Sequence, residues 1–242
     1  MRLRLREFRP RTGPHEHRVV QPRQSLRHTS LRAPEPVGLL LGDHDGLNRL
    51  AGLFSFAAYS RHTLVHVPLR GGVPPDEGVG ELVDLLLVHH TYGLRPSTWP
   101  ALRRALGPGV PLTVRTDEAR TARDAAAWRG RQRWSGRQER PDRRDELWHV
   151  THARTLLLFG GRDVFAETAT CLAHAAGWGP RQKDVGKGYM TLMTVLPLVE
   201  PPGGGGGHPD EVMVCFKAHP PYAHFRRPGE PASRPRRPAA AP

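Results

Sequence analysis

Short apolar runs alternate along most of the chain with stretches in which apolar residues recur three and four positions apart. The runs are typical of buried strands, and the spaced residues mark one face of a helix. The expected strands cover 37–41, 63–69, 84–90, 110–116, 154–161, 189–199 and 211–217. The expected helices cover 47–59, 96–106, 117–134 and 162–176, with a short helical segment that ends at 80–83.

This alternation predicts the fold class. Strands that alternate with helices favour a parallel sheet with helices on both faces. We therefore expect an α/β protein with a single doubly wound, mostly parallel sheet (Rossmann-like) over residues 37–217. The last two strands are joined by a segment that contains Gly203 to Gly207 and no helical period. They could form an antiparallel edge.

Residues 1–36 and 218–242 show no sustained apolar period, so we expect disordered basic tails. Residues 1–36 hold nine Arg against three Glu, and residues 217–242 hold six basic residues against one Glu, so most of the net charge of +13 lies there. This basicity suits phosphate contact, but only three of the 36 basic residues are Lys. A GC-rich genome would give the same bias, and a start site placed too far upstream would also explain residues 1–36.

The sequence contains no apolar run near the roughly 18 residues that a membrane span needs, and no apolar segment follows the Arg-rich start. We therefore expect a cytoplasmic protein without membrane contact. Cys171 and Cys215 each lie in an apolar pattern and are predicted to be small buried hydrophobic residues. A disulfide between them is the alternative.

Polar clusters follow two of the expected strands. In a parallel sheet, ligands bind beyond the carboxyl ends of the strands, so these clusters could meet in one crevice. Carboxylate and imidazole groups together would hold a divalent cation such as Mn²⁺ or Mg²⁺, and a bound water could attack phosphorus. The predicted metal ligands are Asp43, Asp45, His89 and His90. The predicted contacts to a phosphorylated substrate are His44, Arg131 and Arg133.

Each of these residues also has a purely structural interpretation. Asp45 could cap the helix expected from Leu47, and Asp43 would favour the positive end of the same helix. His89 and His90 alternate faces in a strand, so at most one points at a given crevice unless the chain has turned. The glycine run is more typical of a linker than of a phosphate-binding loop.

The Asp43-x-Asp45-Gly46 turn, the "VHH" at 88–90 and the "GGGGGH" at 203–208 together resemble the DHH phosphoesterases. This resemblance implies a metal-dependent enzyme that cleaves phosphodiesters or pyrophosphate, often in short nucleic acids. It implies that Asp43 and Asp45 bind metal, and that the Gly-rich stretch with His208 binds substrate. Val88 replaces the expected acid before the histidine pair, and only Asp84 could serve as the middle aspartate.

Two other functions fit the sequence. Within residues 115–144, ten arginines face five acids, with Trp128 and Trp134 among them. Arginine neutralises phosphate and indole stacks on bases, so a non-catalytic nucleic-acid-associated protein could use Arg131, Arg133 and Arg137. The third possibility is a regulatory module on a Rossmann-like fold with no active site, which Val88 favours.

Overall fold

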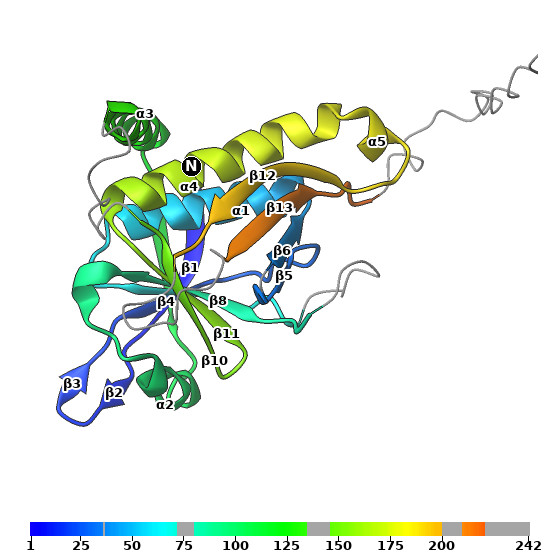
Figure 1. Ribbon diagram of the computed structural model, residues 1–242. Coiled ribbons are helices and arrows are strands. Elements are labelled where there is room, and N and C mark those ends of the chain that lie inside the picture. Colours follow the sequence, from blue (N-terminus) through cyan, green and yellow to red (C-terminus); the bar gives the residue numbers. More distant parts are fainter. Residues whose placement is uncertain (36, 72–79, 135–145, 200–209, 221–242) are drawn as a thin grey trace, which may run out of the picture.

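A computed structural model describes residues 1–35, 37–71, 80–134, 146–199 and 210–220 (Figure 1). The larger sheet contains, in spatial order, β10 (Trp148–His152), β11 (Thr155–Gly160), β8 (Asp84–His89), β7 (Leu64–Val67), β4 (Val19–Pro22), β1 (Arg2–Phe8) and β9 (Val110–Arg115). The smaller sheet contains β12 (Thr191–Pro197), β13 (Glu211–Phe216), β6 (Val37–Gly42) and β5 (Ser30–Arg32). A short hairpin pairs β2 (Arg11–Thr12) with β3 (His15–Glu16).

Helices cover both faces of the larger sheet. The long helices lie above it in Figure 1: α1 (His44–Ala58), α3 (Glu118–Trp134) and α4 (Arg162–Trp178). The short helix α2 (Trp99–Arg104) lies below it, and α5 (Lys183–Gly186) follows α4. Single 3₁₀ turns form η1 (His90–Tyr92), η2 (Pro96–Thr98) and η4 (Gly179–Arg181). No helix within the described residues combines the length and the apolar content needed to span a bilayer.

The predicted single, mostly parallel sheet is wrong, although the α/β class is confirmed. In the larger sheet only β8–β11 and β4–β7 are parallel neighbours, and the other pairs are antiparallel. The expected strands at 37–41 and 63–69, with the helix at 47–59 between them, would form a parallel pair in such a sheet, but β6 and β7 lie in different sheets. A strand buried on both faces has an apolar sequence whichever way its neighbours run, so the pattern did not report strand direction.

The expected antiparallel edge of the last two strands is confirmed, because β12 pairs antiparallel with β13. Of the helical segment expected to end at 80–83, residues 72–79 lie outside the described part, and residues 80–83 are not helical. Leu82 instead forms an antiparallel bridge with Arg32, and the backbone of Ala33 bonds to that of Glu81. This bridge brings the end of β5 close to the start of β8.

The disordered arm expected over residues 1–36 is also corrected. The first 32 residues form five strands, and β1 lies inside the larger sheet between β4 and β9. Its residues alternate: Leu3 and Leu5 are buried beneath the long helices, whereas Arg2, Arg4 and Arg6 are exposed on the opposite face. Of the expected C-terminal tail, residues 221–242 lie outside the described part.

The core has one layer on each side of the larger sheet. Above it, α1 and α4 pack together, and Phe54 meets Phe165 edge to face with ring centroids 5.9 Å apart. Below it, Trp99 and Leu102 of α2 pack on strands β7, β8 and β11. Because α2 is short, it covers only part of this lower face, and among the described residues those of β1 and β9 from Arg2 to Arg6 and from Pro111 to Arg115 on this face are exposed.

Candidate nucleic-acid interface

Asp43 is the N-cap of α1. Its Oδ1 accepts a hydrogen bond from the backbone N–H of Gly46 at 2.8 Å, and the residue is only 8% exposed. The helix therefore begins at His44, three residues before the predicted start, and Asp43 rather than Asp45 is the cap. A carboxylate in this position satisfies a free N–H and is favoured by the helix dipole. Capping alone explains where Asp43 lies.

The two residues after Asp43 point elsewhere. The Asp45 carboxylate is exposed and forms an ion pair with Arg49, one helical turn later, at 3.4 Å. The His44 Nδ1 donates to the carbonyl of Ala176 at 3.0 Å, which ties the start of α1 to the end of α4. His44 thus has a structural contact, and its predicted contact with substrate stays a prediction.

His89 and His90 lie at the carboxyl end of β8, as predicted. Their rings stack with centroids 4.6 Å apart, and the His89 Nδ1 accepts a hydrogen bond from the backbone N–H of Thr91. Burial, followed by the nearby His90, Arg61 and His62, lowers the pKa of His89 to about 4. His89 is therefore a neutral imidazole at neutral pH.

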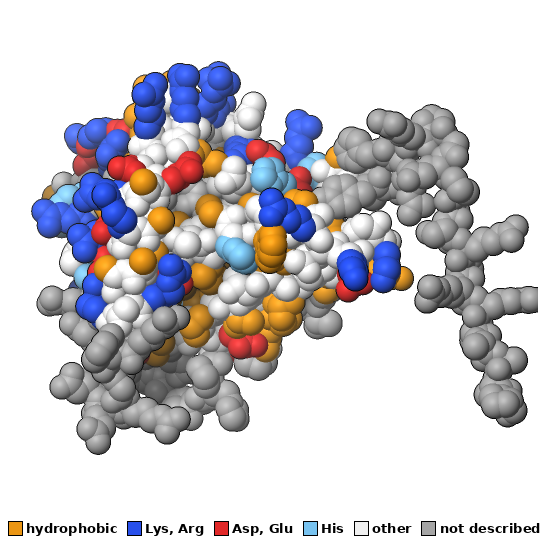
Figure 2. All heavy atoms as spheres, turned by 90° about the horizontal axis from the view of Figure 1, so that it is seen from above, with side chains coloured by type: hydrophobic (Ala, Val, Ile, Leu, Met, Phe, Trp, Pro, Cys, Tyr) orange, Lys and Arg blue, Asp and Glu red, His pale blue; other side chains and the backbone are white. Residues whose placement is uncertain are grey.

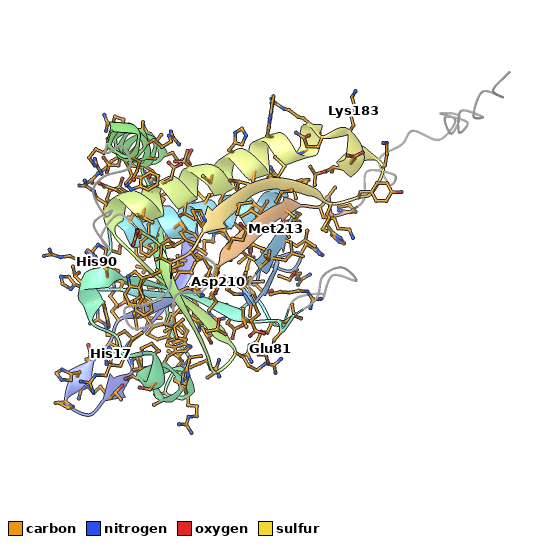
Figure 3. The ribbon with its side chains drawn as sticks, viewed as in Figure 1. His17, Glu81, His90, Lys183, Asp210 and Met213 are labelled. Carbon is orange, nitrogen blue, oxygen red and sulfur yellow. The ribbon has the colours of Figure 1, made fainter. Side chains whose placement is uncertain are left out.

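The structure does not bring the aspartates and the histidine pair together. Asp43 directly precedes the first residue of α1, whereas Arg61 and His62, which act on His89, follow its last residue. A helix of 15 residues is about 22 Å long, and metal–ligand bonds are near 2 Å. In Figure 3 His90 lies at the left, while β6, which leads into Asp43, lies at the right. Across the described residues no three His, Cys, Asp or Glu side chains are placed to hold a metal ion.

Asp84, the one candidate for the middle aspartate of the phosphoesterase motif, is engaged in a buried network. It is 3% exposed, and its carboxylate accepts hydrogen bonds from the backbone N–H groups of Leu69 and Arg70 and from the Arg70 guanidinium at 2.7 to 2.8 Å. Burial alone would raise the pKa of Asp84, but the His66 imidazole 3.7 Å away and the hydrogen bonds from Arg70 outweigh it and hold this pKa well below its usual value. The Arg103 guanidinium of α2 lies 3.8 Å away. Asp84 therefore holds α2 and the loop after β7 against the sheet.

The arginines predicted on α3 are interleaved with acids. Arg131 forms an ion pair with Asp163, and Arg129 pairs with Glu167 at 2.9 Å, so these side chains bind α3 to α4. Figure 2 shows this side of the molecule, with carboxylates among the basic side chains. Arg133 belongs to α3, but its side chain lies outside the described part, as do Arg137, Gly203 to Gly207 and His208.

A different set of arginines lies on the lower face of the larger sheet. In antiparallel neighbours, residues directly opposite each other project from the same face. Arg2 is opposite Arg115, Arg4 is opposite Thr113, and Arg6 is opposite Pro111 and Gln21. The backbone N–H of Arg23 bonds to the carbonyl of Arg4, which extends this register by one residue. We call these five exposed residues the arginine face: Arg2, Arg4, Arg6, Arg23 and Arg115.

The arginine face carries no opposing charge. The positions between its members are Pro111, Thr113 and Gln21, and none of its five guanidinium groups forms an ion pair with a described residue. Alternate residues of one strand are about 6.8 Å apart, and neighbouring strands about 4.8 Å. The arginines therefore form a compact two-dimensional array of like charge.

The sequence contained a signal for this face. Residues 2–6 read "RLRLR", a strict alternation of charged and apolar residues, which is the pattern of a strand buried on one side. The abundance of Arg and Pro across residues 1–36 obscured it. The composition of the segment suggested disorder, while its period specified a strand.

Chemistry by a cysteine nucleophile is disfavoured at the one thiol that is not fully buried. Burial and the neighbouring Glu167 raise the pKa of Cys171 to about 11, so this thiol is protonated at neutral pH. Cys215 is buried, and the two cysteines do not form a disulfide, so this alternative is not realised. No protein-family model, curated protein or solved structure matches the chain.

Proposed function

We propose that this protein binds nucleic acid through the arginine face and that binding does not involve catalysis. The observation that carries the proposal is the placement of Arg2, Arg4, Arg6, Arg23 and Arg115 on one open sheet surface with no acid among them. A GC-rich coding bias explains how many arginines the chain has. It does not explain why five of them share one face without an acid, while Arg129 and Arg131 of α3 are paired with carboxylates.

Phosphate is the chemistry that fits this face best. The guanidinium group donates two parallel hydrogen bonds to a phosphate, and repeated guanidinium groups suit a polymer that repeats its phosphates. None of the positions named on this face is aromatic, so base stacking does not contribute. We therefore expect contacts to the phosphate backbone and little dependence on base sequence.

The predicted metal-dependent phosphoesterase is the weaker proposal. Asp43 is a helix cap, Asp84 is held by arginine, and the histidine pair lies at the other end of α1. Hydrolysis would require a cation site, which the described residues do not assemble. We propose that binding takes place in the cytoplasm, where the reduced thiols of Cys171 and Cys215 would persist.

The test is binding of the full chain to a labelled duplex of about 20 base pairs, followed by fluorescence anisotropy over a range of salt concentrations. Five phosphate contacts predict that log K falls against log salt with a slope of about −4 to −5. The double variant Arg4→Glu with Arg6→Glu should weaken binding at least about tenfold and reduce the slope by about 2.

The matched control is Arg123→Glu with Arg181→Glu, which changes the net charge equally on the helical side of the molecule. Both residues are exposed. This control should retain most of the affinity. Equal losses in the two double variants would show that only net charge matters, and binding that is insensitive to salt would contradict the proposal outright.

A further inference from the structure

β12 is an edge strand without the usual protection of a sheet edge. One side of it pairs with β13, and over Thr191–Pro197 no strand in the described part of the chain pairs with the other; just beyond the strand, Val199 bridges to Trp148. Residues 188–199 contain no charged side chain. Natural proteins usually place charge on such edges, because their free N–H and C=O groups can pair with another chain.

The outer face of the smaller sheet is apolar as far as this edge. Leu39, Leu41 and Cys215 form a separate cluster with Met213, which is labelled in Figure 3. Leu192 lies opposite Cys215 and Val195 lies opposite Met213, so both extend the cluster onto β12. Leu192 is 52% exposed and Val195 is 37% exposed. Leu39, Leu41 and Cys215 are buried, so the exposed apolar side chains of this face are those at the open edge.

The two ends of β12 carry opposite charge. Lys183 and Lys187 lie just before its start, on and after α5, and Asp184 between them pairs with Lys187 at 3.1 Å, so one positive charge remains in excess. At its end, Pro197 is opposite Glu211, which follows Asp210 at the start of β13. Figure 3 shows Lys183 at the right-hand end of this region and Asp210 towards the left.

We propose that β12 pairs antiparallel with β12 of a second copy of this chain. In such a pair the start of each strand lies beside the end of the other, so Lys183 and Lys187 of one copy approach Glu211 of its partner. The contact is self-complementary, as a two-fold interface requires. The two four-stranded sheets become one sheet of eight strands, and the exposed Leu192 and Val195 side chains are covered. This inference is independent of nucleic-acid binding.

The interface is small. A bulge between Leu192 and Thr194 interrupts the register, and Pro197 lacks a donor, so few backbone hydrogen bonds can form. We therefore expect a reversible dimer with a dissociation constant on the order of micromolar. Tyr189 and Met190, both exposed just before the strand, would add apolar contact.

The experiment is sedimentation velocity of the full chain from about 1 to 200 µM, which should show a monomer–dimer equilibrium. Leu192→Lys and Val195→Lys should each weaken the dimer at least about tenfold. The control is Val110→Lys, because Val110 is a 69% exposed apolar residue on β9, an edge of the other sheet. It should leave the dimer unchanged, and circular dichroism checks that each variant folds.

Charge exchange tests the antiparallel arrangement. Lys183→Glu and Glu211→Lys should each weaken the dimer, and the combined variant should recover most of the loss. A monomer at every concentration overturns the proposal, as does a dimer that Val110→Lys weakens or that Leu192→Lys spares. Failure of the combined variant to recover overturns the arrangement, and a monomer that captures an apolar strand peptide would show a different occupant.

Discussion

Single residues account for much of what the candidate cluster at 43–45 does. Asp43 supplies a cap, His44 a link to α4, and Asp45 an ion pair with Arg49. The sequence correctly predicted a helix terminus after an apolar strand. The predicted cap, Asp45, is two residues too late. Both aspartates are good capping residues, and the sequence alone does not show which of them precedes the first helical residue.

The role of Asp43 can be tested by comparing two substitutions. Asp43→Ala should lower the free energy of unfolding by about 1 kcal/mol, because an N–H of α1 loses its acceptor. Asp43→Asn should change it little, because the amide oxygen still caps the helix. Urea denaturation measures both. A metal ligand would give a different result, with Asn as harmful as Ala and with loss of bound metal.

Among elements, the sequence predicted which segments are strands and helices better than which of them are neighbours. The apolar runs that became β6, β7, β8, β11 and β13 were all found, as were α1, α3 and α4. The arginine face was missed, because it depends on β1, β4 and β9 being adjacent. Adjacency is decided by long-range packing, which a local period does not encode.

The junction between α4 and β13 offers a prediction at the scale of elements. A Cβ on Gly179 would overlap the ring of Phe216, whereas one on Gly177 would meet nothing within 4 Å. Gly179→Ala should therefore destabilise the protein by about 1–3 kcal/mol. Gly177→Ala, inside α4, should be neutral or stabilising by up to about 1 kcal/mol. Thermal unfolding of the two variants measures the difference in stability. Equal effects would show that the backbone at this junction shifts to accommodate the added Cβ without loss of stability.

For the whole molecule, stability should fall as the pH drops below about 6.5. Burial lowers the pKa of His66, and the pKa of His89 falls to about 4. Between pH 6.5 and 4 these histidines therefore bind protons in the unfolded chain but not in the native state. Each group contributes at most about 1.4 kcal/mol per pH unit, and the partly exposed His89 less because solvent screens it. Asp84, with its lowered pKa, adds a further loss below about pH 4.

Denaturant midpoints measured from pH 7 to pH 3 test this dependence. His89→Asn keeps an acceptor for the N–H of Thr91 and removes one titrating group, so its profile should be flatter between pH 6.5 and 4. His66 would still titrate among its neighbours Asp84, Arg70, Arg103, Gln21 and Trp99. A wild-type midpoint that is constant from pH 7 to pH 4 would contradict the assignment of buried neutral histidines.

The central place of β1 has a consequence for how the chain folds as it is made. Its neighbour β9 follows more than a hundred residues later in the sequence, and the sequence separation between the paired strands β6 and β13 is greater still. At roughly 5–20 residues per second, β1 leaves the ribosome several seconds before its second partner exists. Such distant pairings slow folding, so the nascent protein completes its larger sheet only late in translation.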